Sequence, residues 1–351
     1  LQSTNYFTAG PYLPRRIERV RWFGQDWSKR SGYAQNAGGI AKAALGAWRI
    51  DAGLFHSRFT FDRYAADFLR DITPDGVGNR STLAGRDQRE SSVSSELRGS
   101  RDWQEGDRLH RAILSVRARR VQSLYGGFGT ADLGRSRIGV EDFRPEPTYS
   151  FGPLIRDRVR QESLSAGYEL RWTGVGELNL GLTRSRYKKV VVEPNRPETR
   201  QLDEPWLWNA ALALTPTSRL VLYASTTRGL EESGLAPTNA ANGLQALPAL
   251  RTRQIEAGFR YALPANLRLV GGVFDIRKPY FAVDEADNVF RVLGDVRHRG
   301  IELSLSGQPV RGLNVVVGAV LLDPRVTGQA VDDGRLGRRP LGRTDTVLDL
   351  R

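Results

Sequence analysis

The sequence predicts an all-β fold: a transmembrane antiparallel up-and-down β-barrel, present in part, with about 12–14 strands. Stretches in which apolar and polar residues alternate recur along the 351 residues, and each pair of stretches is joined by a short turn. Long polar segments separate one pair from the next. Short turns at one end and long loops at the other are typical of outer-membrane barrels, in which alternate residues of a strand face lipid.

The hairpin over residues 163–187 shows the repeating unit most clearly. Apolar side chains alternate with polar ones up to Trp172, the chain turns at 173–176, and the alternation resumes at Leu178. A period of two places the two sets on opposite faces of a strand. The apolar set, expected to point outward, comprises Leu164, Leu170, Leu178, Leu180, Leu212, Leu214, Ile301 and Leu303. The polar set, expected to point inward, comprises Glu169, Arg171, Glu177 and Asn179.

Five further hairpins follow from the same pattern, with turns near 45–46, 103–107, 215–218, 263–266 and 308–312. Six hairpins give about twelve strands, and Gly, Pro, Asn and Ser supply the turn conformations. A further strand is expected from Thr344, and another around 17–23. The segments between hairpins are expected to be loops: 58–90, 119–158, 184–205, 226–251, 277–296 and 323–343. Residues 61–69 have helical apolar spacing, which predicts a short helix inside the first loop.

Two soluble β folds compete with the barrel. The strands of a β-sandwich also alternate apolar and polar residues, but the loops are short at both ends of its strands. A propeller repeats every ~40–50 residues, close to the spacing here, but its blades carry four strands where each repeat here carries two. Aromatic residues at both strand ends favour membrane interfaces over ordinary packing. The girdle near the short turns is Trp48, Trp172 and Tyr261, and the opposite girdle is Trp206, Trp208 and Tyr187.

Composition narrows the range of functions. The chain has no Cys, which excludes disulfides, thiol nucleophiles and thiolate metal sites. It has no Met and starts at Leu1, so we expect a fragment or a processed chain. The formal net charge is +13, with arginine far outnumbering lysine. Such a surface can bind nucleic acid, lipid phosphate or an anionic ligand, while a GC-rich genome that encodes Arg for Lys explains the same excess.

Catalytic and metal-binding patterns are missing from the sequence. His56, His110 and His298 are scattered over three strand regions and lack the paired spacing of a zinc site. The glycine-rich stretches lack the third glycine and the following helix of a dinucleotide loop. Acidic pairs at 231–232, 284–285 and 332–333 fall in predicted loops, where solvated charge explains them better than acid–base catalysis. We therefore expect no enzyme, no metal and no cofactor.

Five stretches, in order, resemble the barrel of TonB-dependent siderophore receptors. They are 220–231 (LVLYASTTRGLE), 250–261 (LRTRQIEAGFRY), 272–279 (GVFDIRKP), 298–303 (HRGIEL) and 337–342 (GRRPLG). The fourth resembles the family's recurring Arg-Gly-x-Glu strand entry, which implies that Glu302 faces the lumen. The similarity is strongest from about Leu220 to Pro340, and residues 1 to about 215 share only general hairpin character.

The resemblance implies a partial receptor barrel over residues 1–351, with the plug domain and the C-terminal strands absent. Such a truncated barrel is expected to leave two unpaired strand edges, or a curled sheet that closes with too few strands. The implied function is uptake of a ferric siderophore across the cell outer membrane by a monomer. The implied partners are the TonB energy-transducing complex, reached through the missing plug, and outer-membrane lipid and lipopolysaccharide; nucleic acid is not expected. The alternatives are a receptor for another substrate (cobalamin, a sugar or another metal chelate) and a passive porin-like barrel.

Residues of the predicted outer loops are the candidates for ligand contact. Arginine binds carboxylate, catecholate and hydroxamate oxygens through directed donors, and aromatic rings offer flat apolar contact. For any single residue, loop packing is the competing explanation, and for the arginines so is lipopolysaccharide phosphate. The candidates are Tyr125, Phe128, Arg135, Arg137, Tyr149, Tyr280, Arg338 and Arg339.

Overall fold

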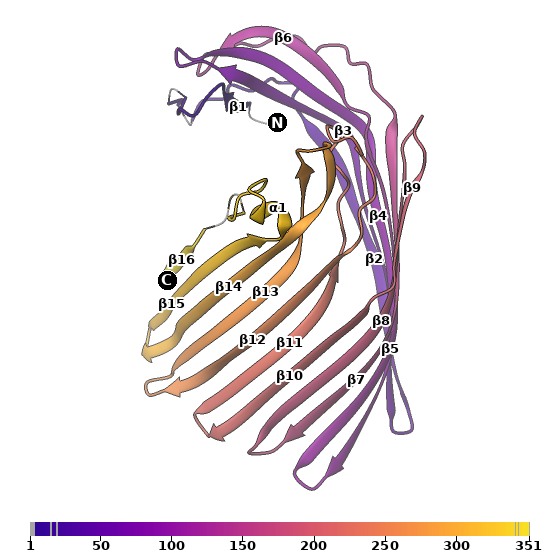
Figure 1. Ribbon diagram of the computed structural model, residues 1–351, viewed down its shortest axis with the longest axis vertical. Helices are drawn as coiled ribbons and strands as arrows, with labels where there is room; N and C mark the ends of the chain where they lie inside the picture. Colours follow the sequence, from indigo (N-terminus) through magenta and orange to yellow (C-terminus); the bar gives the residue numbers. More distant parts are fainter. Residues whose placement is uncertain (1–3, 15, 19, 341, 343, 351) are drawn as a thin grey trace.

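The computed structural model describes residues 4–14, 16–18, 20–340, 342 and 344–350. These residues form one sixteen-stranded sheet that curves into an open wall, with a four-residue helix, α1 (Gln329–Asp332), near one corner (Figure 1). The wall is built, in order, from β2 (Arg30–Leu45), β3 (Trp48–Ile72), β4 (Val77–Glu105), β5 (Arg108–Gly126), β7 (Leu154–Trp172), β8 (Gly176–Val192), β10 (Trp206–Thr217), β11 (Leu220–Glu231), β12 (Leu250–Leu263), β13 (Leu267–Asp284), β14 (Val289–Val310), β15 (Leu313–Thr327) and β16 (Thr346–Leu350). Three short strands pair beside it: β1 (Asn5–Thr8) on β3, β6 (Gly129–Arg137) on β4, and β9 (Thr199–Asp203) on β8.

All six predicted hairpins are confirmed. The pairs β2–β3, β4–β5, β7–β8, β10–β11, β12–β13 and β14–β15 are antiparallel, and each turn falls where the pattern placed it. Gly46 (φ +59°) and Gly312 (φ +87°) occupy the left-handed region that two of these turns require. The short turns lie together at one end of the wall (Figure 1). One continuous sheet in sequential order rules out a propeller, in which strands pair within separate four-stranded blades.

The strand registers define two faces of the wall, because directly paired residues lie on the same face. Leu180 pairs with Tyr168 and Ala210, whereas Glu169 pairs with Asn179 on the other face. Six of the eight residues in the apolar set are exposed, with Leu164 61% and Ile301 56% exposed, and the other two, Leu170 and Leu178, are half-buried. The polar face receives the segment that follows β11. We call the apolar side the convex face and the polar side the concave face, and this division confirms the two predicted sets.

The strands run well beyond the predicted loop boundaries, so the prediction of a long loop is wrong for most of these segments. β3 continues to Ile72 and β4, with 29 residues, starts at Val77, which makes 58–90 an extended hairpin. β8 and β13 likewise extend to Val192 and Asp284. Above the lipid-facing band both faces of a strand can be polar, so the period-two signal disappears while the backbone stays extended. Three long segments of the predicted loops do remain without a strand among the described residues: 138–153, 232–249 and 328–340.

The helix predicted over 61–69 is wrong, because these residues belong to β3. Ala65, Ala66 and Asp67 are all buried in succession. The N-terminal segment packs against this part of β3, and β1 pairs with it in parallel. Both faces of the strand are therefore covered, and consecutive apolar residues imitate the spacing of a helix.

Strand predictions near the two ends of the sequence had mixed outcomes. β16 begins at Thr346 and confirms the strand expected from Thr344. No strand forms in the described part of 17–23, and residue 19 lies outside the described residues, as do 341 and 343 of the last predicted loop. Within the described residues β2 and β16 each pair with a single neighbour, which gives the two expected edges. No helix among these residues is long and apolar enough to cross a membrane.

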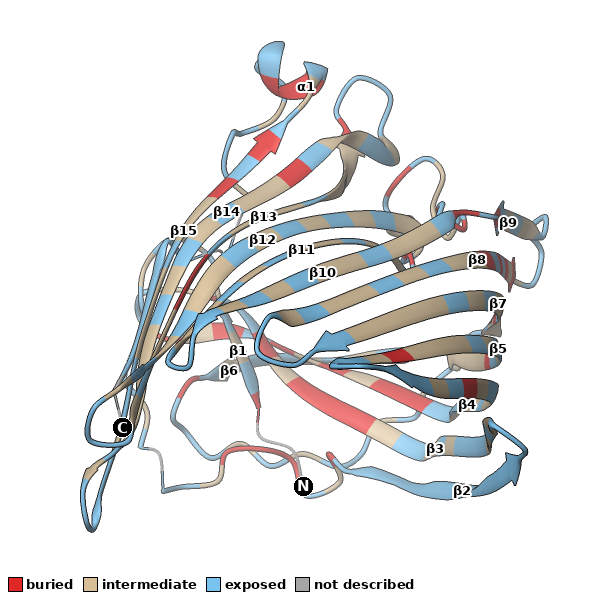
Figure 2. Cartoon of the chain, turned by 90° about the horizontal axis from the view of Figure 1, so that it is seen from below, coloured by how far each residue is buried: buried red, intermediate tan, exposed pale blue. Residues whose placement is uncertain are grey.

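Buried residues form small patches, and most of the wall is exposed or half-buried (Figure 2). This is the expected distribution when a fold presents its apolar surface to lipid instead of to a single core. One patch contains Val121, Val159, Tyr187 and Ala249, and Tyr187 is only 2% exposed. Tyr187 lies on the concave face, so its assignment to the outer aromatic girdle is wrong. Trp206, on the convex face and 51% exposed, fits that girdle.

Candidate functional site

The concave face carries a pocket of about 720 Å³ beside the middle of β4 and at the ends of β5, β7 and β8 that are far from the short turns. The segment 232–249 folds back over these strand ends and forms the opposite side of the pocket. Its lining includes Phe61, Tyr125, Asp157, Lys189 and Glu232. We call this the outer-end pocket. It is open enough for a bulky ligand and combines aromatic surface with a cluster of charges.

Lys189 is the centre of the charge cluster, and its side chain is only 3% exposed. Its Nζ lies 3.1 Å from Asp157 Oδ2 and 3.5 Å from Glu232 Oε1, and it donates a hydrogen bond of 2.9 Å to the Ser233 carbonyl oxygen. A buried ammonium needs such partners to offset its lost hydration. Lys189 thereby ties the folded-back segment to the wall.

The alternation of β8 explains why Lys189 points into the pocket. Ser185, Tyr187 and Lys189 occupy successive concave positions, and all three are buried. The folded-back segment is fixed at its other end by Asp203, whose Oδ2 accepts a hydrogen bond of 3.0 Å from the Ala249 amide. The segment is therefore held at both ends while its middle borders the pocket.

One acceptor in the pocket is left open. Asp157 Oδ1 is buried and has no hydrogen-bond partner among the described residues. Buried carboxylate oxygens normally accept hydrogen bonds, because an unsatisfied one is costly. A ligand that donates a hydroxyl or amide hydrogen to this atom would satisfy it.

The predicted ligand-contacting residues do not gather in one place. Tyr125 lines the outer-end pocket. Phe128, Arg135, Arg137 and Tyr149 lie around β6 and the segment that follows it. Several of these make structural contacts: Arg137 donates to the Asp75 carbonyl oxygen at 2.6 Å, and Tyr149 donates to Thr82 Oγ1 at 3.1 Å. Burial raises the pKa of the Tyr149 phenol, so its hydroxyl stays a donor over the physiological range.

The other three predicted residues lie on or beside β13 and β15. Tyr280 packs against the buried cluster of Val296, Val326 and Val331. Arg339 pairs with Asp345 at 2.8 Å, and the backbone carbonyl of Arg338 accepts a hydrogen bond from the Val326 amide. The eight residues thus fall into separate groups, and their role in ligand contact stays a prediction.

Sequence reasoning missed the residues that build the outer-end pocket, namely Asp157, Lys189, Glu232 and Ser233. A signal was available in the sequence, since lysine is rare in this arginine-rich chain and Lys189 lies at a concave position near the far end of its strand. What could not be seen is the fold-back of 232–249. Two inward-facing arginines have partners within the sheet: Arg171 lies 3.6 Å from Glu177, and Arg260 lies over the Tyr223 ring.

Comparison with known proteins matches this architecture. The family model described as "TonB dependent receptor-like, beta-barrel" matches residues 2–344. The ferrichrome receptor FcuA of Yersinia enterocolitica is 31% identical over 138 residues, which cover 37% of this chain and 18% of that protein. No group of three or more potential metal ligands occurs within the described residues.

Solved structures share the fold. The ferric preacinetobactin receptor BauA of Acinetobacter baumannii superposes with a TM-score of 0.76 at 18% identity, covering 99% of this chain and 53% of that one. The ferripyoverdine receptor of Pseudomonas aeruginosa gives a TM-score of 0.75 at 14% identity, covering 99% and 47%. The chain therefore spans about half the length of these structures.

Proposed function

This chain belongs to the TonB-dependent receptor β-barrel family, and from that premise we propose that it forms part of the wall of an outer-membrane receptor that takes up a ferric siderophore with energy supplied through TonB. The family is one of outer-membrane receptors and transporters, not of enzymes. Family membership over residues 2–344 is the observation that carries the proposal. The outer-end pocket supports it, because a receptor must capture a scarce, bulky chelate before transport.

The charges of the outer-end pocket favour one class of chelate. Lys189 is already paired with Asp157 and Glu232, and Glu90 adds a further carboxylate. Such a site does not attract a strongly anionic ferric tris-catecholate. A neutral ferric tris-hydroxamate suits it better, because the aromatic rings of Phe61 and Tyr125 supply contact area and Asp157 Oδ1 can accept a hydrogen bond from the ligand. The Yersinia relative is a ferrichrome receptor, which agrees with this choice.

The test is uptake of labelled iron by cells that lack the gene and are complemented with the full-length receptor. Complementation should restore uptake of a neutral ferric hydroxamate under iron limitation, and deletion of tonB should abolish it. Restored uptake of an anionic catecholate alone would overturn the choice of hydroxamate. Restoration of cobalamin, sugar or another metal-chelate uptake, without any siderophore, would overturn the substrate class.

A further inference from the structure

Five arginines form a ladder across five neighbouring strands. They are directly paired in register: Arg228 of β11 with Arg253 of β12, Arg253 with Arg277 of β13, Arg277 with Arg297 of β14, and Arg297 with Arg325 of β15. Strands lie ~4.8 Å apart, so the ladder is roughly 19 Å long. Like charges placed directly opposite each other destabilise a sheet. An uninterrupted row of five therefore calls for a compensating anion.

The ladder lies on the convex face, beyond the apolar residues, and on β13, β14 and β15 one row of charged residues (Asp275, Arg299 and Asp323) lies between the two. Along β12 the outward residues nearer the short turn are Ile255 and Ala257, and along β14 they are Arg299, then Ile301 and Leu303. Ile255, Val273, Ile301, Leu303 and Leu321 are between 46% and 56% exposed, as expected of side chains that face lipid. The guanidinium groups thus start where the lipid-facing surface ends.

Carboxylates of the protein neutralise only part of the ladder. The Asp275 carboxylate pairs with three arginines: it lies 2.9 Å from Arg297 Nε, 3.2 Å from Arg299 Nε and 3.5 Å from Arg277 Nε. Asp323 pairs with Arg325 at 2.9 Å. Arg299 is itself a sixth cation beside the ladder, so positive charge exceeds negative charge there.

The two arginines at the other end have no carboxylate partner among the described residues. Arg228 lies over the Trp208 ring at 4.9 Å, and no ion pair is present for the exposed Arg253. Arginine is suited to phosphate because its planar donors bind two oxygens at once. Arg253 therefore offers a free set of donors, and its neighbour Arg277 is held only through Nε, in a contact of 3.5 Å with Asp275.

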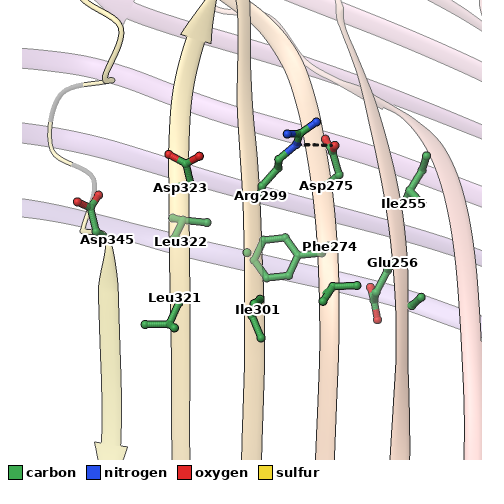
Figure 3. Close-up of a pocket in the computed structure, with 13 residues that line it drawn as sticks. Ile255, Glu256, Phe274, Asp275, Arg299, Ile301, Leu321, Leu322, Asp323 and Asp345 are labelled. Carbon is green, nitrogen blue, oxygen red and sulfur yellow. Dashed lines mark hydrogen bonds and ion pairs between the residues drawn. The ribbon is translucent and has the colours of Figure 1, made fainter.

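A shallow groove of about 580 Å³ adjoins the ladder, lined mostly by convex-face residues. In Figure 3 the charged side chains of Asp275, Arg299 and Asp323 lie at one end of the groove, and the apolar side chains of Ile301 and Leu321 lie toward the other. This division into a charged rim and an apolar strip matches an amphipathic molecule whose tails lie along the wall.

We propose that the arginine ladder binds the phosphorylated headgroup of an outer-leaflet glycolipid of the lipid A type, with an acyl chain lying along the adjoining groove. The position of the ladder at the edge of the lipid-facing surface selects a membrane lipid over a soluble anion. The inference depends on the outer-membrane location and not on which chelate the receptor transports.

The experiment uses the full-length receptor purified from outer membranes in detergent, with native mass spectrometry as the readout. The probes are bisphosphorylated lipid A, monophosphorylated lipid A and inorganic phosphate. The wild-type protein should retain bisphosphorylated lipid A, and the double variant Arg253→Gln/Arg277→Gln should bind it about tenfold or more weakly, because two charge-assisted contacts are lost. Loss of one phosphate from the lipid should also weaken binding to the wild type.

Matched variants separate binding from folding. Arg260→Gln/Arg268→Gln removes two arginines from the concave faces of the same strands and should leave lipid A binding unchanged. Arg253→Lys/Arg277→Lys keeps the charges and should restore part of the affinity. Equal lipid binding by the ladder variant and the wild type, with heat-modifiable gel mobility showing both folded, would overturn the proposal. Displacement of lipid A by equimolar inorganic phosphate would overturn the choice of a lipid. Siderophore uptake by the same variants should be unchanged.

Discussion

The buried ion pair between Asp67 and Arg80 fastens the N-terminal segment to the wall. Their side chains are 0% and 3% exposed. Asp67 accepts hydrogen bonds from Arg80 Nε at 3.0 Å, from Arg80 Nη2 at 2.6 Å and from Thr4 Oγ1 at 2.6 Å. Arg80 also donates to the Phe23 carbonyl oxygen at 3.0 Å. One carboxylate thus joins β3, β4 and the segment that precedes β2.

Replacing Asp67 with Asn should release this segment. Breaking a buried ion pair costs about 3–5 kcal/mol, because the remaining charge stays buried without its partner. Arg80 keeps its bonds to the carbonyl oxygens of Phe23 and Asp142, which places the expected loss near ~3 kcal/mol. A loss of that size corresponds to roughly a hundredfold faster local opening.

Hydrogen–deuterium exchange measures the opening directly. Amides of β1 (Asn5–Thr8) and of residues 23–28 should exchange about a hundred times faster in the Asp67→Asn variant, under conditions in which exchange reports local opening. The control is Asp87→Asn, because Asp87 and its partner Arg86 are 74% and 61% exposed and their separation is 3.7 Å. Exchange in the Asp67 variant that matches this control would refute the reasoning.

Three further perturbations test other parts of the structure. Lys189→Met removes the donor that holds the folded-back segment, so amide exchange over 232–236 should rise by about tenfold or more, while the barrel hairpins keep their protection. Gly307→Ala should lower the free energy of unfolding by about 1–3 kcal/mol in a urea titration, because φ is +147° and the added Cβ would lie 2.1 Å from a backbone oxygen. Its control is Gly318→Ala, which should have little effect because the added Cβ has no neighbour within 4 Å. The Arg144 guanidinium lowers the pKa of Asp142 below its ordinary 3.8. The pair therefore stabilises segment 138–153 at pH values above 3.8, and this stabilisation is lost as the pH falls through the lowered pKa. Amide exchange of that segment should show this acid dependence in the wild type and not in the Asp142→Asn variant.

The hairpins could be predicted because lipid imposes a strict alternation on the strands. Leu164 and Leu180 face outward, and along each strand every second residue faces the other way, so the pattern predicts both the strands and the turn between them. Outside the lipid-facing band that constraint ends. The extensions of β3 to Ile72 and of β4 from Val77 carry no comparable signal, although backbone pairing continues through them.

The candidate site was less predictable because it depends on tertiary contacts. Tyr187 looks like a girdle residue by composition, but the fold-back of 232–249 buries it on the concave face. Lys189 acquires its role only when Glu232 and Ser233 come within reach of it. The predicted arginines were chosen from apparent loops. The strongest basic feature, the ladder from Arg228 to Arg325, lies within strands, and only the register of the sheet reveals it.

The sequential order of the wall also determines how it can assemble. Every hairpin pairs with the hairpin that precedes or follows it in the chain, and β9 pairs with the strand just before it, whereas β1 pairs with β3 and β6 with β4 across one intervening strand. Pairing between sequence neighbours closes only short loops, so each addition loses little chain entropy. The unpaired edge of a partly formed wall presents free backbone donors and acceptors to the next hairpin. The same edge that invites aggregation in water can therefore act as the growing end during insertion, with hairpins added one at a time in the order of the chain.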